Sequence, residues 1–387
     1  MRSKEMPDEQ SLELRTGRAT VPLAFAESDG EVYLVAQHRS AQWPVDILRT
    51  GRASLLLQGR TIEGVPTLVT SPADRDRILE LFRSKYGGER FAEWYRHPAR
   101  VLRVTPTGSG SSADRPASAY YDWLRAEFDN VAADYDRHIT GNRMNRLLRD
   151  RSLQILGRRF RDCRRVLEIG CGSGMETLPM LEQGHEVLAV DISGEMLATV
   201  RAKAARAGVA ERLTTCELAA HDLERLLDTN GAGSFDGAYS TFGALNCEPE
   251  LTGIPPVLAR LLRPGAPFLA GIYNRWCLFE LGGYALTLQG RRAVGRRRNP
   301  VPVGASRFCI DVYAYSVADF QRLFLPFFDR ERVEGVPVLL PPSDLTRYAD
   351  RFAGHFDQLA ALDAAAGRRW PLNRLGDHFL ASYARRP

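Results

Sequence analysis

The sequence predicts an α/β protein in two parts, a small β-barrel followed by a seven-stranded parallel sheet that helices cover on both faces. In the second part, strand-like runs alternate with helical patterns of ten or more residues, which is typical of a parallel sheet. In the first part, strand-like runs follow one another with few helices between them. The segment that separates them, Thr105 to Ser118 (TPTGSGSSADRPAS), has no apolar periodicity and is typical of a linker. We therefore predict a barrel over residues 1–104, a linker over 105–118 and the sheet domain over 119–387.

The composition fits a folded, soluble protein. Of the 387 residues, 44% are hydrophobic and 26% charged, and the net charge of +5 gives no general nucleic-acid signal. The six cysteines show no CxxC spacing, so we expect isolated thiols and no metal site. The N-terminal segment MRSKEMPDEQ lacks the apolar core of a signal peptide. The longest apolar stretch, Trp276 to Leu288, is shorter than the roughly 20 residues that a membrane span needs. We expect a cytoplasmic protein.

The elements of the barrel follow from turn residues and apolar runs. A Ser-Asp-Gly turn at residues 28–30 predicts a hairpin, because Asp-Gly supplies the positive φ values of a tight turn. Ser71 and Pro72 are a typical N-cap and first residue of a helix. The predicted strands are Ala19–Ala26, Glu31–Gln37, Ala53–Gln58, Thr61–Thr70 and Val101–Val104, with short helical segments at Trp43–Arg49 and Phe91–Tyr95.

The sheet domain has seven strand candidates, a helix near residues 317–327 and one long insertion. The predicted strands are Arg165–Ile169, Glu186–Asp191, Leu213–Glu217, Phe235–Ser240, Pro267–Tyr273, Val333–Leu340 and His378–Tyr383. The insertion, about residues 274–315, has an apolar part followed by five arginines, Arg291, Arg292, Arg296, Arg297 and Arg298. These arginines can meet an anionic group or an acidic membrane surface, or form a solvent-facing loop.

The most informative run is Val166 to Gly174, VLEIGCGSG, in which a strand breaks into three glycines. Glycine allows a tight turn and lets a ligand approach main-chain N–H groups. Asp191 ends the next strand, where a carboxylate can accept the hydroxyls of a ribose. Met175 stands where the dinucleotide pattern GxGxxG requires glycine. The sequence therefore predicts a nucleotide-like ligand other than a dinucleotide.

The pattern E-x-G-x-G-x-G, which begins at Glu168, resembles the first motif of class I S-adenosylmethionine-dependent methyltransferases. The segments FDNVAADYD, VDISGEML, AHDL, SFDGAYSTFGALN and LRPG resemble further segments of that family in the same order, and the likeness covers roughly residues 120–387. It implies a Rossmann-like sheet and S-adenosylmethionine as cofactor. It also implies that Asp191 binds the ribose, that Met196 and Asp222 lie near the adenine, and that Tyr135 closes over the cofactor. The cofactor-binding residues implied in this way are Tyr135, Glu168, Gly170, Cys171, Gly172, Gly174, Asp191, Ile192, Met196, Asp222, Leu223 and Ser240. Asp191 can instead cap a helix, and Tyr135 can be a core residue.

The resemblance predicts methyl transfer to a small-molecule acceptor that is apolar or amphiphilic. Such transfer needs little beyond positioning and exclusion of water, so no catalytic residue is singled out. His221, His138 or Tyr273 can assist if the acceptor must lose a proton. The segment TFGALN lacks the Asn/Asp-Pro-Pro-Tyr motif of methyltransferases that act on bases or amides, which disfavours nucleic acid as the acceptor. In the resemblance, the insertion forms a lid over the acceptor.

The first part of the chain resembles, more faintly, split-barrel flavin- and deazaflavin-binding proteins of the nitroreductase-like kind. The likeness rests on the run from Ala19 to Leu57. It implies that a phosphate or cofactor contacts His38, Arg39, Ser40 and Trp43, with Arg60 a weaker candidate. Two readings stay open. The protein is bifunctional, with flavin- or deazaflavin-dependent reduction in the barrel, or the barrel is a non-catalytic binding or dimerisation module that forms a homodimer.

Overall fold

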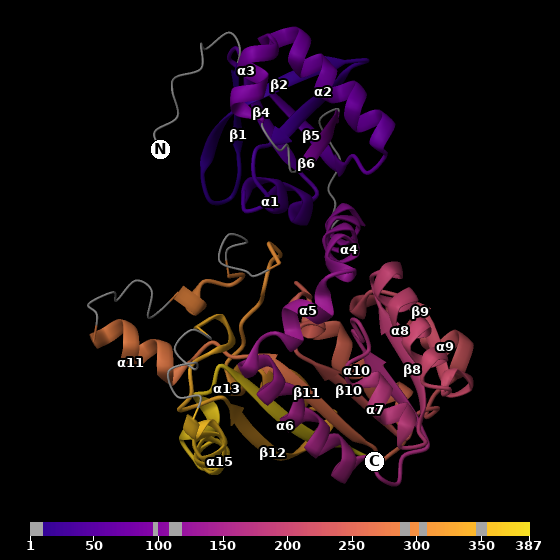
Figure 1. Cartoon of the computed structure of the whole chain (residues 1–387). Helices are drawn as coiled ribbons and strands as arrows, with labels where there is room; N and C mark the ends of the chain where they lie inside the picture. Colours follow the sequence, from indigo (N-terminus) through magenta and orange to yellow (C-terminus); the bar gives the residue numbers. More distant parts are fainter. Residues whose placement is uncertain (1–10, 96–99, 108–117, 287–294, 302–307, 346–353) are drawn as a thin grey trace. The chain divides into compact units, whose positions relative to one another are not determined.

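The structure is a computed structural model that describes residues 11–95, 100–107, 118–286, 295–301, 308–345 and 354–387. The chain forms two compact units, Met1–Glu127 with Val303–Cys309, and Phe128–Pro302 with Ile310–Pro387 (Figure 1). Most of the predicted linker, residues 108–117, lies outside the described residues, so its boundaries stay a prediction. No helix in the described part of the chain is both long and apolar enough to cross a membrane.

The first unit contains a closed barrel of six antiparallel strands in the order β1-β2-β3-β6-β5-β4. The strands are β1 (Ser11–Arg15), β2 (Thr20–Ser28), β3 (Glu31–Ala36), β4 (Ala53–Leu57), β5 (Arg60–Leu68) and β6 (Arg100–Pro106). The predicted hairpin is confirmed, with Asp29 and Gly30 at φ values of 56° and 78°. The sequence analysis missed β1, which pairs with β2 on one side and β4 on the other and so closes the barrel. This strand has only two buried apolar residues, Leu12 and Leu14, so its alternation is too short to stand out.

The described part of the first unit also contains helices. They are α1 (Trp43–Thr50), α2 (Pro72–Tyr86), α3 (Gly88–Trp94) and α4 (Ser118–Ala132), whose last residues belong to the second unit. Ser71 caps α2 as predicted, with its Oγ accepting from the Asp74 N–H at 3.4 Å. The buried hydroxyl of Tyr86 donates to the Phe25 carbonyl at 2.8 Å and accepts from the Phe25 N–H at 3.0 Å. This pair of hydrogen bonds fixes α2 to strand β2.

The second unit contains the predicted seven-stranded Rossmann-like sheet, in the order β12-β13-β11-β10-β7-β8-β9. The strands are β7 (Arg165–Ile169), β8 (Glu186–Asp191), β9 (Leu213–Glu217), β10 (Gly237–Thr241), β11 (Pro267–Tyr273), β12 (Phe328–Val336) and β13 (His378–Arg385). The sheet is mixed, because β13 runs antiparallel to both of its neighbours. The sequence analysis placed one strand at residues 333–340, whereas β12 spans Phe328–Val336. It is an edge strand in which Asp-Arg-Glu-Arg is exposed, so a search for apolar runs finds only its buried end.

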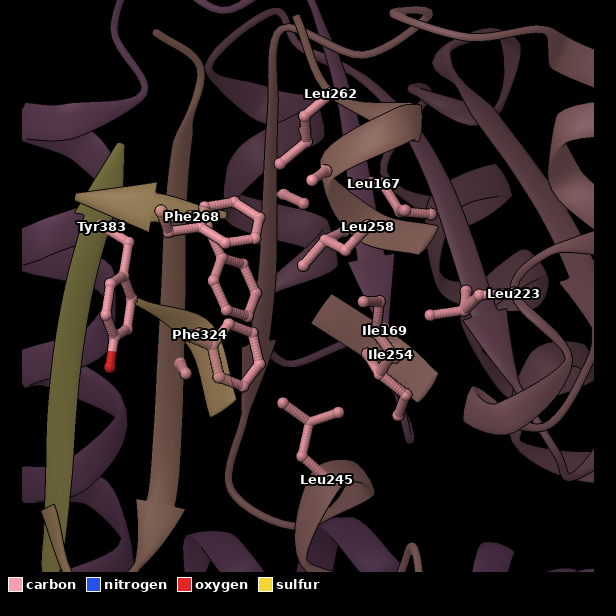
Figure 2. Close-up of a cluster of buried hydrophobic side chains, with 14 of the residues drawn as sticks. Leu167, Ile169, Leu223, Leu245, Ile254, Leu258, Leu262, Phe268, Phe324 and Tyr383 are labelled. Carbon is pink, nitrogen blue, oxygen red and sulfur yellow. The ribbon is translucent and has the colours of Figure 1, made fainter. Parts of the chain in front are cut away.

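Helices cover both faces of the sheet, as predicted. They are α5 (Tyr135–Thr140), α6 (Arg143–Arg159), α7 (Thr177–Glu182), α8 (Gly194–Arg206), α9 (Arg225–Asn230), α10 (Ile254–Leu261), α11 (Leu278–Leu286), α13 (Val317–Phe324) and α15 (Phe356–Ala366). One core lies between the sheet and α6, α7 and α8. The other lies between the sheet and α9, α10 and α13, where Phe268 stacks on Phe324 with ring centroids 5.3 Å apart (Figure 2). The sequence analysis did not predict α15.

Candidate functional site at the carboxyl edge of the sheet

The glycine run after β7 forms a tight loop at the carboxyl edge of the parallel strands. All three glycines have positive φ, at 75° for Gly170, 51° for Gly172 and 80° for Gly174. The Gly170 N–H donates to the Val190 carbonyl at 2.7 Å, which ties the loop to β8. A Cβ on Gly170 would lie 2.1 Å from the Cβ of Ala244, in the segment after β10. Only glycine therefore fits where the loop meets this segment.

Asp191, the last residue of β8, holds this loop from the other side. Its Oδ2 accepts from the Gly172 N–H at 2.8 Å, and its Oδ1 accepts from the Ser193 N–H at 2.9 Å. Burial raises the pKa of Asp191 to about 6, although these backbone donors act to lower it. The N-cap of α8 is Ser193, whose Oγ accepts from the Met196 N–H at 3.1 Å. Asp191 is thus a carboxylate at the sheet edge rather than the cap of α8.

A buried group of charged side chains lies beside the loop. Glu168, in β7, accepts from the Thr177 hydroxyl at 2.5 Å, and burial raises its pKa to about 8. Glu176 accepts from the Arg149 guanidinium of α6 at 2.7 and 2.6 Å. The sequence analysis missed Arg149 and Glu176, because their pairing joins positions 27 residues apart that no local motif links.

Tyr135, the first residue of α5, lies over the glycine loop. Its Cε1 atom is 3.7 Å from the position that a Cβ on Gly172 would take. Burial raises the pKa of Tyr135. The nearby Arg149 acts to lower this pKa, and Glu176 and Asp191 act to raise it. The structure therefore brings Tyr135, Gly172 and Asp191 together, as the predicted site requires.

The remaining predicted residues divide by position. Ile192 follows Asp191, and Met196 is buried in the first turn of α8. Asp222 ends a short 3-10 helix after β9 and is partly exposed, with Oδ1 3.2 Å from His221 Nε2, while the next residue, Leu223, is buried.

Two predicted residues have roles inside the protein. The Ser240 hydroxyl donates to the Ile169 carbonyl at 2.9 Å, which joins β10 to β7. Burial raises the pKa of the Cys171 thiol, which suits a residue that contributes its backbone to the loop.

The segment after β10 forms the next wall of this edge. Phe242 has φ of 54°, an unusual value for a bulky residue, and its N–H donates to the Gly271 carbonyl at 3.1 Å. The Arg149 guanidinium lies 5.0 Å from the centroid of the Phe242 ring. Asn246 holds the segment in place, because its side chain accepts from the Tyr273 N–H at 3.0 Å and donates to the Tyr313 carbonyl at 2.7 Å.

The prediction of a solvent-facing or anion-binding arginine cluster in the insertion is wrong for Arg296. This side chain is 5% exposed, and its guanidinium donates to Glu280 at 2.9 Å and to Asp377 at 2.6 Å. Arg291 and Arg292 lie outside the described residues. Arg297 lies over the Trp276 ring at 5.6 Å, and Arg298 is exposed. A count of charges along the sequence could not reveal that Arg296 has a buried acidic partner 81 positions away, Asp377.

In the first unit, the residues predicted to contact a phosphate do not form one cluster of available donors. Arg39 is ion-paired with Glu127, which also accepts from Arg100 at 2.8 Å. Trp43 is a buried residue at the start of α1. The other three candidates, His38, Ser40 and Arg60, are exposed.

Comparison with known proteins gives a family match for the part of the chain that forms this edge of the sheet. Residues 166–265 match a family model described as a methyltransferase domain. Within the second unit, residues 166–265 form a class I S-adenosylmethionine-dependent methyltransferase domain. This methyltransferase domain includes the glycine loop, Asp191 and the segment after β10.

Curated relatives match parts of the chain. It is 31% identical over 157 residues to the demethylmenaquinone methyltransferase of Beutenbergia cavernae, covering 40% of this chain and 60% of that protein. It is 30% identical over 132 residues to a ubiquinone biosynthesis O-methyltransferase of Xanthomonas axonopodis pv. citri, covering 34% and 51%. It is 30% identical over 106 residues to the tRNA 5-carboxymethoxyuridine methyltransferase of Escherichia coli, covering 26% and 41%. The chain thus spans only part of the length of these relatives.

Among solved structures, the chain is similar to the 1,6-didemethyltoxoflavin-N1-methyltransferase of Burkholderia thailandensis. The two are 19% identical, the match covers 73% of this chain and 95% of that one, and the TM-score is 0.43.

Proposed function

We propose that the protein transfers a methyl group from S-adenosylmethionine to a small-molecule acceptor. The observation that carries the proposal is the pairing of the glycine loop with Asp191 at the carboxyl edge of the sheet, where open α/β sheets bind their ligands. The family match over residues 166–265 supports it.

The residues at this edge fit the chemical groups of the cofactor. Asp191 offers a carboxylate to the ribose hydroxyls, and Met196 with Leu223 offers apolar contact to the adenine. The loop has no Cβ at Gly172, and Tyr135 lies above it, so this end would hold the methionine portion. When bound, the cofactor supplies an electrophilic methyl group. The chain positions the acceptor and excludes water.

A small-molecule acceptor is supported by the relatives, with one competing class. One of the relatives is named for demethylmenaquinone, one for ubiquinone biosynthesis and one for a modified tRNA base. The segment TFGALN after β10 lacks the motif expected for base methylation, and the net charge is only +5. We therefore favour an apolar or amphiphilic small molecule over RNA.

Isothermal titration with S-adenosylmethionine and S-adenosylhomocysteine tests the proposal. We expect saturable binding that Asp191→Ala weakens by about 10- to 100-fold, because a charged hydrogen-bond partner contributes about 1.5–3 kcal/mol. Asp228→Ala, at an exposed position of α9, is the matched control and should bind as the wild type does. A wild type that binds neither compound, or an Asp191→Ala variant with unchanged affinity, contradicts the proposal.

For the barrel, a flavin or deazaflavin and a role in dimerisation or acceptor capture both remain predictions. The ion pair between Arg39 and Glu127 removes one expected phosphate ligand, so no observation favours the flavin. Visible absorbance that the protein retains after either cofactor is supplied tests the first prediction. Light scattering of the full chain tests the second.

A further inference from the structure

We propose that His378, oriented by Asp377, is the general base that takes a proton from the acceptor, and that the acceptor carries an acidic aromatic or enolic hydroxyl. This inference rests on the proposed methyl transfer. The sequence analysis named three other residues as possible bases and did not consider His378.

The topology places His378 at the functional edge. Strand β13 runs antiparallel to β11, and His378, its first residue, pairs with Tyr273, the last residue of β11. The start of β13 therefore lies at the carboxyl edge of the parallel strands. Between β13 and the glycine loop after β7 lie β11 and β10, a distance of about 14 Å along the edge at the usual strand spacing. His378 and the glycine loop therefore lie at the same edge of the sheet, on strands about 14 Å apart.

Asp377 fixes the ring of His378. Its Oδ2 lies 3.2 Å from His378 Nδ1, and its Oδ1 accepts from Arg296 at 2.6 Å. Burial alone would raise the pKa of Asp377, but Arg296 and His378 hold it well below its usual range. Asp377 is therefore a carboxylate, which holds the ring proton on Nδ1 and leaves the lone pair on Nε2.

The acidic groups around Arg296 do not form a metal site. Cys277, Glu280 and Asp377 bring three possible ligand atoms within 4.8 Å of one another. The Arg296 guanidinium bonds to both carboxylates of this group and lies 4.1 Å from the centre of the Tyr273 ring. The positive charge that these carboxylates require is thus supplied by the protein. This network fixes Asp377 and, through it, the imidazole.

Two aromatic rings lie next to the imidazole of His378. Phe242 and Tyr273 lie 5.5 and 5.3 Å from the ring of His378, at interplanar angles of 82° and 66°. The His378 side chain is 12% exposed, and among the described residues its only hydrogen-bond partner is on Nδ1. An imidazole with aromatic rings beside it favours an acceptor that is flat and has an acidic hydroxyl.

The chemical step is balanced as follows. The acceptor oxygen attacks the methyl carbon of S-adenosylmethionine while its proton moves to Nε2 of His378. The bond between methyl carbon and sulfur breaks, its electron pair stays on sulfur, and S-adenosylhomocysteine leaves. The imidazolium then returns its proton to solvent.

Nitrogen NMR of the full chain labelled with ¹⁵N-histidine tests the positioning role of Asp377. We expect the His378 ring, assigned through its loss in His378→Gln, to carry its proton on Nδ1 at neutral pH. Asp377→Asn should shift the ring toward the other tautomer. A wild-type ring protonated on Nε2 alone would overturn the proposal. Thermal melting checks that both variants fold. If Asp377→Asn does not fold, the wild-type tautomer, assigned through His378→Gln, still tests the proposal.

Binding of 4-nitrocatechol tests the base itself, because its ionised form has its own absorption band. At a pH low enough for the free probe to stay protonated, and with S-adenosylhomocysteine bound, we expect the wild type to draw the proton and produce this band. His378→Gln should reduce the band at least tenfold and lower the methylation rate of this probe by about 100-fold. His355→Gln, at the exposed start of α15, is the control and should match the wild type.

The outcomes separate this inference from the proposed function. A protein that binds S-adenosylhomocysteine but shows no band dependent on His378 overturns the base and leaves methyl transfer standing. A protein that binds neither S-adenosyl compound overturns the proposed function, while the tautomer measurement still judges the pair of Asp377 and His378.

Discussion

The contact between the glycine loop and the segment after β10 predicts that Gly170→Ala destabilises the second unit more than alanine at a matched glycine does. An alanine at Gly170 adopts a φ of 75° and places its Cβ 2.1 Å from that of Ala244. The left-handed conformation costs about 1–2 kcal/mol for a residue with a Cβ. Displacing Ala244 and its backbone adds about 1–3 kcal/mol. Gly208 has a similar φ of 71° with no atom within 4 Å, so Gly208→Ala should cost only the conformational part.

Differential scanning calorimetry of the full chain can measure both costs. For a unit of this size, 1 kcal/mol corresponds to about 2–4 °C in Tm, so Gly170→Ala should melt roughly 2–12 °C below Gly208→Ala. Only the transition of the second unit should move, because both glycines lie there. Gly170→Ala should also weaken binding of S-adenosylhomocysteine, and Gly208→Ala should not. Equal melting temperatures for the two variants would refute the close approach of the loop to Ala244.

Three further predictions concern buried polar groups. Burial raises the pKa of Glu168 to about 8, so this group is neutral at pH 7 and Glu168→Gln should lower the free energy of unfolding by under about 1 kcal/mol. Glu176→Gln should lower it by about 3–5 kcal/mol, because Arg149 loses its buried partner. Urea unfolding at pH 7 compares the two variants, and equal losses would contradict a neutral Glu168 beside a charged Glu176. Burial raises the pKa of Asp191 to about 6, so the contribution of this residue to stability increases as pH falls from 6 toward 4. The affinity for S-adenosylmethionine, which uses the carboxylate, should instead fall by up to tenfold per pH unit below 6. Calorimetric titration from pH 8 to 5 measures this affinity, and a constant value would contradict the prediction. In the barrel, Tyr86→Phe leaves a buried backbone pair of β2 without its hydroxyl and should cost about 1–3 kcal/mol in the first unit's transition alone, which chemical unfolding followed at the barrel tryptophans can detect.

The glycine loop and the carboxylate beside it, which form the proposed cofactor side, could be predicted from the sequence because their determinants are local. The glycines and Glu168 lie within one strand and turn, and Asp191 ends the next strand at the spacing that the fold requires. The N-cap of α2 and the Asp-Gly hairpin were predictable for the same reason, since each depends on adjacent residues. The structure adds that Asp191 binds the loop N–H directly, which spacing alone does not reveal.

The rest could not be predicted, because it depends on contacts between distant residues. Arg296 and Asp377 are 81 positions apart, and the run of arginines around Arg296 has the composition of a solvated loop. Strand β12 begins with charged residues because it is an edge strand, and edge position is a property of the assembled sheet. Strand β1 is recognised as a strand only through its two partners.

This division between local and distant determinants has a consequence for acceptor specificity. The proposed cofactor side uses residues between Tyr135 and Leu223, whereas the proposed acceptor side is completed by Phe242, Tyr273 and the antiparallel strand that begins at His378. Because β13 joins the site through β11, the Arg296 network and the Phe242 ring, substitutions around it can change the acceptor while leaving the glycine loop intact. Exchange of Tyr273 or His378 should therefore alter which hydroxyl compounds are methylated while the affinity for S-adenosylhomocysteine stays the same. A change in that affinity would show that the two halves of the site are coupled.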